Sequence, residues 1–340
     1  MGNSYLGRTL LAGLLALGLA GAVAAEPFRL IITDLETPLV PNSVMDLAEK
    51  LGYFEAEGVE VELVRVQQTP SALAALQAGE GEMANIGTDA LLQLVLGGAT
   101  DLRAVTSPNK ALPFLIAARD GIDTPADLAG ASFGVGRVGS LDHSLSMKVL
   151  ASQGVAVDGL EVVTLGQPSA RAQALAAGQI DATTMSIGVW SAMPDKTGLH
   201  VLIGQDDYFA AAPVVSKVNI VTQATLDTRG DEVQAVIRAL TKLSRTFADT
   251  PEVWVDAVAA ARPDVERATL ETLAVAFRES WSINGGLSAD ELKYTTDWLY
   301  QTEDFAGKPP VALEAWVDFG PVDKVLTDIG TAPGLDAQTR

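Results

Sequence analysis

Residues 134–139 follow the pattern G-x-G-x-x-G between an expected strand and an expected helix. Dinucleotide-binding folds use this pattern to bring backbone N–H groups to a pyrophosphate at a helix N-terminus. They also place an acidic residue at the end of the next strand, but that strand here ends in Gly166 and Gln167. We therefore expect this turn to present N–H groups to an anion rather than to a nucleotide.

A second helix start with possible ligand groups follows the segment "EMANIG". Gly87 ends that expected strand, and Thr88 and Asp89 begin the next helix. A hydroxyl and free N–H groups at a helix start can bind a sulfonate, carboxylate or phosphate oxygen. The alternative is that Thr88 or Asp89 only caps its own helix. Ser140 and the polar loop with Gln68 and Thr69 carry the same two interpretations.

The other candidates differ in their chemistry. Arg137 is the cation that we expect for an anionic group, unless it is a surface arginine. Trp190 is placed either to stack on a ligand or to fill the core. The expected ligand-binding residues are Thr37, Gln68, Thr69, Gly87, Thr88, Asp89, Arg137, Gly139, Ser140, Ser186 and Trp190.

Catalytic and metal-binding side chains are scarce in this sequence. It has no cysteine, and His143 and His200 are its only histidines. The acidic pairs Asp206–Asp207 and Glu303–Asp304 lie among other charges and are expected on solvated surfaces. We therefore predict no catalytic residues, no metal site and no cofactor.

The N-terminal residues have the layout of a secretory signal peptide. One arginine precedes an uncharged apolar run over residues 9–23, and small residues come before Glu26. We expect residues 1–25 to be removed and the protein to be periplasmic, with a retained membrane anchor as the alternative. Without cysteine it cannot be a lipoprotein. The formal net charge of −20 argues against binding to nucleic acid or an anionic membrane.

Strands and helices alternate through the first two thirds of the chain. Residues 28–106 predict four strands separated by helices, which is typical of a parallel sheet with helices on both faces. The alternation of strands and helices starts again near residue 130, and helices dominate from Gly230 onward. We predict an α/β protein of two lobes, residues 26–117 with 214–340 and residues 118–213, joined by two hinge crossings.

One helix–turn–strand segment occurs twice in the sequence, in similar form. "ALQAGEGEMANIG" at 75–87 and "ALAAGQIDATTMS" at 174–186 agree at four positions, and an acidic residue, Glu82 or Asp181, follows at the same offset. Chance similarity of alanine-rich helices is one explanation. The other is that two related lobes face each other, with ligand bound beyond the carboxyl ends of their strands.

The segment at 46–92, "TPADLAG", "RAQALAAGQIDA" and "WSINGGLS" together resemble a known family. It comprises the type II periplasmic solute-binding proteins of nitrate, sulfonate, taurine and thiamine-precursor ABC importers. The resemblance implies a monomer that closes on a small organic anion, a sulfonate or carboxylate, and then docks on a membrane permease. A thiamine-precursor pyrimidine is the alternative ligand, and a membrane receptor the alternative partner. An enzyme branch of this family is expected to carry cysteines, which this chain lacks.

Overall fold

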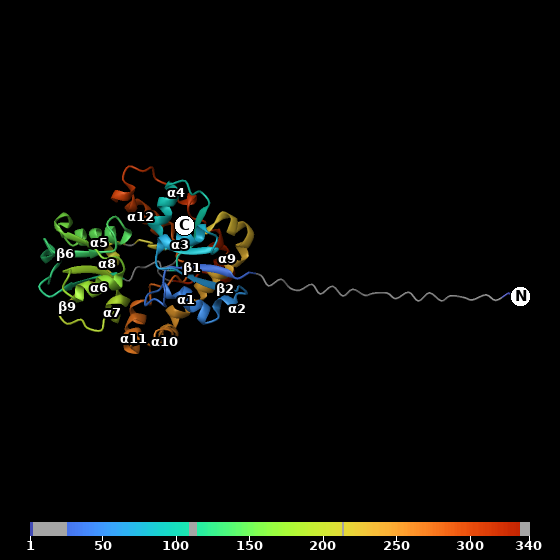
Figure 1. The fold of residues 1–340 in the computed structure, drawn as a ribbon, viewed down its shortest axis with the longest axis horizontal. Helices are drawn as coiled ribbons and strands as arrows, with labels where there is room; N and C mark the ends of the chain where they lie inside the picture. Colours follow the sequence, from blue (N-terminus) through green and yellow to red (C-terminus); the bar gives the residue numbers. More distant parts are fainter. Residues whose placement is uncertain (3–25, 109–113, 213, 334–340) are drawn as a thin grey trace.

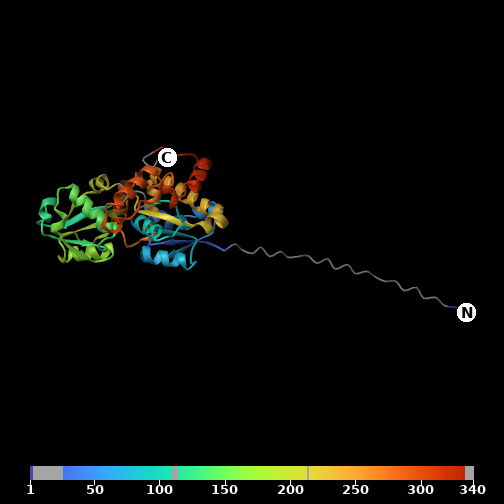
Figure 2. The same ribbon diagram turned by 90° about the horizontal axis from the view of Figure 1, so that it is seen from above.

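The computed structural model describes residues 1–2, 26–108, 114–212 and 214–333. They form two lobes side by side, each built on one β-sheet with helices around it (Figures 1 and 2). This is the predicted two-lobe α/β fold. The expected signal peptide, residues 1–25, lies almost wholly outside the described residues.

The sheet of the first lobe has five strands in the order β2-β1-β3-β10-β4. β1 pairs in parallel with β2 and β3, while β10 runs antiparallel between β3 and β4. The strand bounds are β1 Phe28–Ile32, β2 Val61–Arg65, β3 Met83–Gly87, β4 Leu102–Thr106 and β10 Lys217–Thr222.

The sheet of the second lobe repeats this arrangement in the order β7-β6-β8-β5-β9. β5 is its antiparallel strand and corresponds to β10, although β5 opens its lobe and β10 returns to the first lobe later in the chain. The strand bounds are β5 Phe114–Arg119, β6 Ser132–Val135, β7 Glu161–Thr164, β8 Ala182–Ser186 and β9 Leu199–Ile203.

The pairing of β5 corrects one predicted boundary. All of Phe114–Arg119 pairs with β8 or β9 of the second sheet, so the expected boundary after residue 117 cuts through a strand of the second lobe. The apolar strand follows the first lobe's elements directly in sequence, and local pattern carries no information about which sheet a strand joins.

Helices cover both sheets. Those of the first lobe are α1 Ser43–Lys50, α2 Tyr53–Ala56, α3 Thr69–Gln77, α4 Thr88–Leu96, α9 Gln223–Asp249, α10 Pro251–Ala261, α11 Arg267–Ala276, α12 Ala289–Leu299 and α13 Gly320–Ile329, with the short 3₁₀ turns η3 Glu303–Phe305 and η4 Leu313–Ala315. Those of the second lobe are α5 Leu141–Ser152, α6 Pro168–Ala176, α7 Ile187–Ala192 and α8 Gln205–Ala211, with η1 Pro125–Leu128 and η2 Val157–Gly159.

The helix α9 begins earlier than the helical pattern predicts. The Oγ1 atom of Thr222 accepts the Thr225 N–H at 3.1 Å and caps the helix at its true start. Non-helical backbone angles at Arg229 mark a kink just before Gly230. The expected start at Gly230 is therefore this kink, because a glycine next to a bend resembles a boundary when only the sequence is visible.

The repeated segments form equivalent parts of the two lobes. In the first, α3 leads through Gly79 into β3; in the second, α6 leads through Gly178 into β8. Gly79 has φ of 74° and Gly178 of 67°, a left-handed conformation that glycine adopts at little cost. The predicted relation between the lobes is confirmed for this unit.

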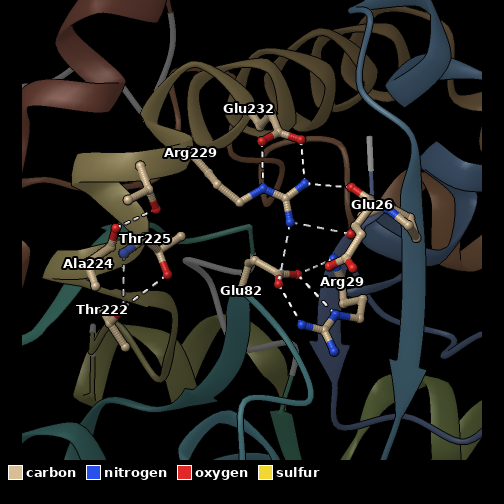
Figure 3. Close-up of polar contacts among 10 residues, drawn as sticks. Glu26, Arg29, Glu82, Thr222, Ala224, Thr225, Arg229 and Glu232 are labelled. Atoms are coloured by element: carbon tan, nitrogen blue, oxygen red, sulfur yellow. Dashed lines mark hydrogen bonds and ion pairs between the residues drawn. The ribbon is translucent and has the colours of Figure 1, made fainter. Parts of the chain in front are cut away.

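The acidic residue of each repeat accepts a backbone N–H at the start of the neighbouring parallel strand. A carboxylate oxygen of Glu82 accepts the backbone N–H of Arg29 at 2.6 Å, and its other oxygen pairs with the Arg29 guanidinium at 2.7 Å. Arg229 approaches the same carboxylate at 3.4 Å and also donates to the carbonyl oxygen of Glu26 (Figure 3). Burial raises the pKa of Glu82, but hydrogen bonds from Arg29 hold it below its ordinary value.

Candidate functional site

The carboxyl ends of the parallel strands of both sheets meet at the interface between the lobes. The loop after β1 contacts α7: a β-carbon on Gly188 would lie 2.2 Å from the carbonyl oxygen of Leu39. The loop after β6 contacts the first lobe: a β-carbon on Gly139 would lie 3.1 Å from an oxygen of Asp304. The expected position of the ligand site, beyond the strand ends, therefore has residues of both lobes beside it.

Lys217 stands at this edge of the first sheet. It is the first residue of the antiparallel strand β10, and it pairs with Gly87 at the end of β3. Its Nζ atom donates to Oγ1 of Thr33, just after β1, at 2.6 Å. Among the described residues no carboxylate lies within ion-pair distance of Nζ. The nearest acidic influence is that of Asp34, which does not outweigh burial.

The environment of Lys217 disfavours its own charge. Burial lowers the pKa of its ammonium group, and Asp34 opposes that shift only in part. A partly buried ammonium bound to a neutral hydroxyl lacks full compensation, because charge removed from water needs an opposite charge or several hydrogen bonds. An anionic group placed at Nζ would supply that compensation.

Asp89 occupies the start of α4 beside the end of β3. Its Oδ1 atom lies so close to Gly87 that a β-carbon there would be 2.4 Å away. Burial raises the pKa of Asp89, while the backbone N–H groups of Ala90 and Asp89 and the charge of Arg137 oppose that shift. The helix start predicted to receive an anion therefore already holds a carboxylate of this chain.

Two backbone N–H groups of the glycine-rich turn likewise bind side chains of this chain. The N–H of Gly136 donates to Oδ2 of Asp142 at 2.9 Å, and that carboxylate also pairs with buried Arg171. The N–H of Gly139 donates to Nδ1 of His143 at 3.2 Å. The expectation that this turn presents free N–H groups to an anion does not hold for these two amides, because side chains from the first turn of α5 reach back to them.

Two predicted ligand hydroxyls are occupied by protein groups. Thr88 is fully buried and donates to the carbonyl oxygen of Val215 at 2.7 Å. Thr37 is 2 % exposed, donates to Asp46 and accepts from Lys50. Both side chains hold the first lobe together, so we do not carry them into the proposed site.

The remaining predicted residues lie at helix starts after the strands. Ser140 caps α5 by accepting the His143 N–H, and Ser186 caps α7 by accepting the Val189 N–H at 3.2 Å. Thr69 accepts the Gly87 N–H at 3.2 Å, next to exposed Gln68.

The two larger candidates have partners of their own. Trp190 is partly buried, and the ammonium of Lys196 lies 5.7 Å from the centre of its ring. Arg137 is exposed, and its charge acts on Asp89 of the other lobe. The guanidinium of Arg137 itself donates to the carbonyl oxygen of Val138 at 3.4 Å.

Lys217 is not among the ligand residues expected from the sequence, and Asp304 lies in a different environment from the one expected. Lys217 is the second residue of "SKVNIV", and a lysine that begins an antiparallel strand beside a parallel strand's end is a signal that could have been used. Asp304, expected on a solvated surface, contacts Gly139 and accepts a hydrogen bond from Gln93 of α4 at 3.3 Å. No local pattern reveals that contact, because it joins the two lobes.

Other possible sites are few in the described ranges. No three histidine or acidic side chains there gather to hold a metal ion, and no helix there is long and apolar enough to cross a membrane. A pocket of about 500 Å³ lies on the first lobe around Phe54, and one of about 340 Å³ lies between Gln205 and Ala276. Lys217 lines neither pocket.

Comparison with known proteins agrees with this architecture. The model of the NMT1/THI5-like family matches residues 44–253. A ligand-binding component of an ABC-type import system from Staphylococcus aureus is similar in structure, with a TM-score of 0.70 and 16% identity over 88% of this chain and 99% of that one. No curated protein matches the sequence.

Two further structures with this fold differ in what they do. The alkanesulfonate-binding protein SsuA from Xanthomonas axonopodis pv. citri, bound to MOPS, has a TM-score of 0.67 and 23% identity over 87% of this chain and 100% of its own. The desulfurization enzyme DSZB has a TM-score of 0.64 and 18% identity over 89% and 99%. The fold thus serves both binding proteins and at least one enzyme.

Proposed function

We propose, from the premise that the chain belongs to the NMT1/THI5-like family, that it is the solute-binding component of an ABC importer. It would act in the periplasm as a monomer, close its two lobes on a small organic anion, and present the closed form to a membrane permease. Sulfonates and carboxylates are the expected ligands. The similar structures of binding proteins from ABC import systems support this assignment.

Lys217 carries the proposal of an anionic ligand. Its ammonium is partly buried at the strand ends, with the Thr33 hydroxyl as its hydrogen-bond partner. We assign the anionic group of the solute to Nζ of Lys217, with Thr33 and Thr69 among the neighbouring polar groups. Arg137 is exposed and is not assigned to the ligand. Since the chain lacks cysteine and the site needs no reacting group, we propose binding without catalysis.

Ligand binding to the exported protein tests this proposal. A thermal-shift screen would compare sulfonates, taurine, nitrate, aromatic carboxylates and pyrimidines, because a ligand at 100 times its Kd adds about 2.7 kcal/mol of stability. Calorimetry would then give the affinity of each hit. For an anionic ligand we expect Lys217→Gln to weaken binding about 10- to 100-fold, as for loss of a charged hydrogen bond.

The matched control is Lys293→Gln, since Lys293 is exposed on α12 and pairs only with Asp297 among the described residues. Its affinity should equal that of the parent protein. A hit restricted to pyrimidines would overturn the anion assignment and keep the binding-protein assignment. A folded protein that no compound stabilises would count against the whole ligand class and favour the receptor-partner alternative.

A further inference from the structure

Gly188 packs against the first lobe so closely that no side chain fits at this position. It is the second residue of α7, it is buried, and a β-carbon built on it would lie 2.2 Å from the carbonyl oxygen and 2.7 Å from the β-carbon of Leu39. Leu39 lies in the loop between β1 and α1, and its own exposure is 7 %. A backbone oxygen cannot turn aside as a side chain can, so even alanine would push the two lobes apart.

The three atoms nearest to that β-carbon all belong to Leu39 of the first lobe. Gly188 lies in a helix and does not have a positive φ, and alanine is favoured over glycine in helices. Its equivalent in the first lobe is Asp89, the second residue of α4, whose pKa the charge of Arg137 in the other lobe tends to lower. Gly188 itself faces the loop that follows β1 of the opposite sheet. The reason for glycine lies across the interface.

We propose that Gly188 is a positioning residue for solute capture, because the absence of its side chain allows α7 to reach Leu39 when the lobes close. This inference rests on the proposed function, in which closure encloses the ligand. Observed affinity falls with the fraction of molecules that can reach the binding-competent state. A side chain at position 188 therefore weakens binding without touching the ligand.

The first test compares Gly188→Ala and Gly188→Val with the parent protein. We expect ligand affinity to fall at least about tenfold, with valine worse than alanine. The unfolding temperature without ligand should change little for alanine, since the molecules that are open lack the contact and alanine favours the helix. The control is Gly230→Ala in α9, where a β-carbon meets nothing within 4 Å. It should bind ligand normally.

A second test does not depend on finding the ligand. Because the chain has no cysteine, Glu62→Cys and Glu161→Cys provide two unique labelling sites, exposed on the outer strands β2 and β7. Single-molecule energy transfer between these labels reports how far apart the lobes stand. We expect Gly188→Val to shift the population toward the more open distances, with ligand and without it.

The outcomes separate this inference from the proposed function. If no ligand binds but Gly188→Val still opens the protein, the function fails and the role of Gly188 stands. If Gly188→Val keeps the parent's distances and affinity, the inference is overturned. If Gly188→Ala loses stability along with binding, glycine is needed for folding, and the positioning role is also overturned.

Discussion

Asp181 accepts the backbone N–H of Ser132 at 2.7 Å, which is the same bond that Glu82 makes with Arg29 in the other lobe. In both, the acid precedes a central parallel strand and accepts a backbone N–H at the start of the strand beside it. An arginine completes each pair, Arg119 for Asp181 and Arg29 for Glu82. The repeated acid thus fixes the relative position of two strands in each sheet.

Replacing either acid should therefore destabilise its lobe. We expect Glu82→Gln and Asp181→Asn each to cost about 1.5–3 kcal/mol, the range for hydrogen bonds to charged groups. Urea unfolding followed by circular dichroism measures the loss. The control is Glu80→Gln, an exposed acid two residues earlier, which should stay within about 0.5 kcal/mol of the parent protein. Equal stability of all three variants would contradict this role.

The stability contributed by these acids should depend on pH. Hydrogen bonds from their partners hold the pKa of Glu82 and of Asp181 below the ordinary values despite burial. A lowered pKa in the folded state adds stability above the unfolded pKa of about 4, and that stability is lost as the pH falls through the folded value. The difference between parent and Glu82→Gln should accordingly shrink below about pH 4. If the difference in stability between the two proteins stayed constant down to pH 2, Glu82 would not be the source of this pH dependence.

Binding of an anion should weaken at alkaline pH because of Lys217. Burial lowers the pKa of its ammonium, so the charge is lost at a lower pH than the ordinary value of about 10.4. Calorimetric titration from pH 7 upward should show the affinity falling in that range. Lys217→Arg should keep the charge and move the fall to higher pH. The same pH profile in Lys217→Gln as in the parent would rule out Lys217 as the titrating group.

The Thr37–Asp46 pair should matter for stability rather than for the ligand. Asp46 is 1 % exposed and accepts hydrogen bonds from Thr37, Lys50 and Arg65. Asp46→Asn should cost about 2–3 kcal/mol and Thr37→Val about 1 kcal/mol. Ligand affinity at a temperature where both variants are folded should remain unchanged. A selective loss of affinity in Thr37→Val would return Thr37 to the ligand site.

Ser107 links Lys217 of the proposed site to the loop that contains Gly285 and Gly286. Its Oγ donates to the carbonyl oxygen of Lys217 at 2.8 Å. Its backbone N–H donates to the carbonyl oxygen of Gly285 at 2.9 Å. Gly286 has φ of 69°, and a β-carbon there would lie 2.0 Å from the Ser107 carbonyl oxygen. Gly286→Ala should therefore cost more than 2 kcal/mol.

Ser107→Ala removes only the bond to Lys217, so it should cost about 1 kcal/mol and lower ligand affinity a few-fold. Chemical denaturation and calorimetry measure the two effects. Retention of full stability by Gly286→Ala would show that this loop can move away from Ser107.

The sequence by itself determined the α/β class, the two related lobes and the expectation of a ligand site at the strand ends. These follow from local patterns: strands and helices have different apolar periods, and a repeated helix–turn–strand segment keeps its residues in one stretch of chain.

Only the tertiary structure decided which polar groups are free. Thr88 donates to Val215, 127 positions away, and Lys217 reaches Thr33 across 184 positions. β5 joins the second sheet through partners that its own sequence does not indicate. A side chain's type states what it can bind, but its partners depend on which distant segments folding brings within about 3 Å of it.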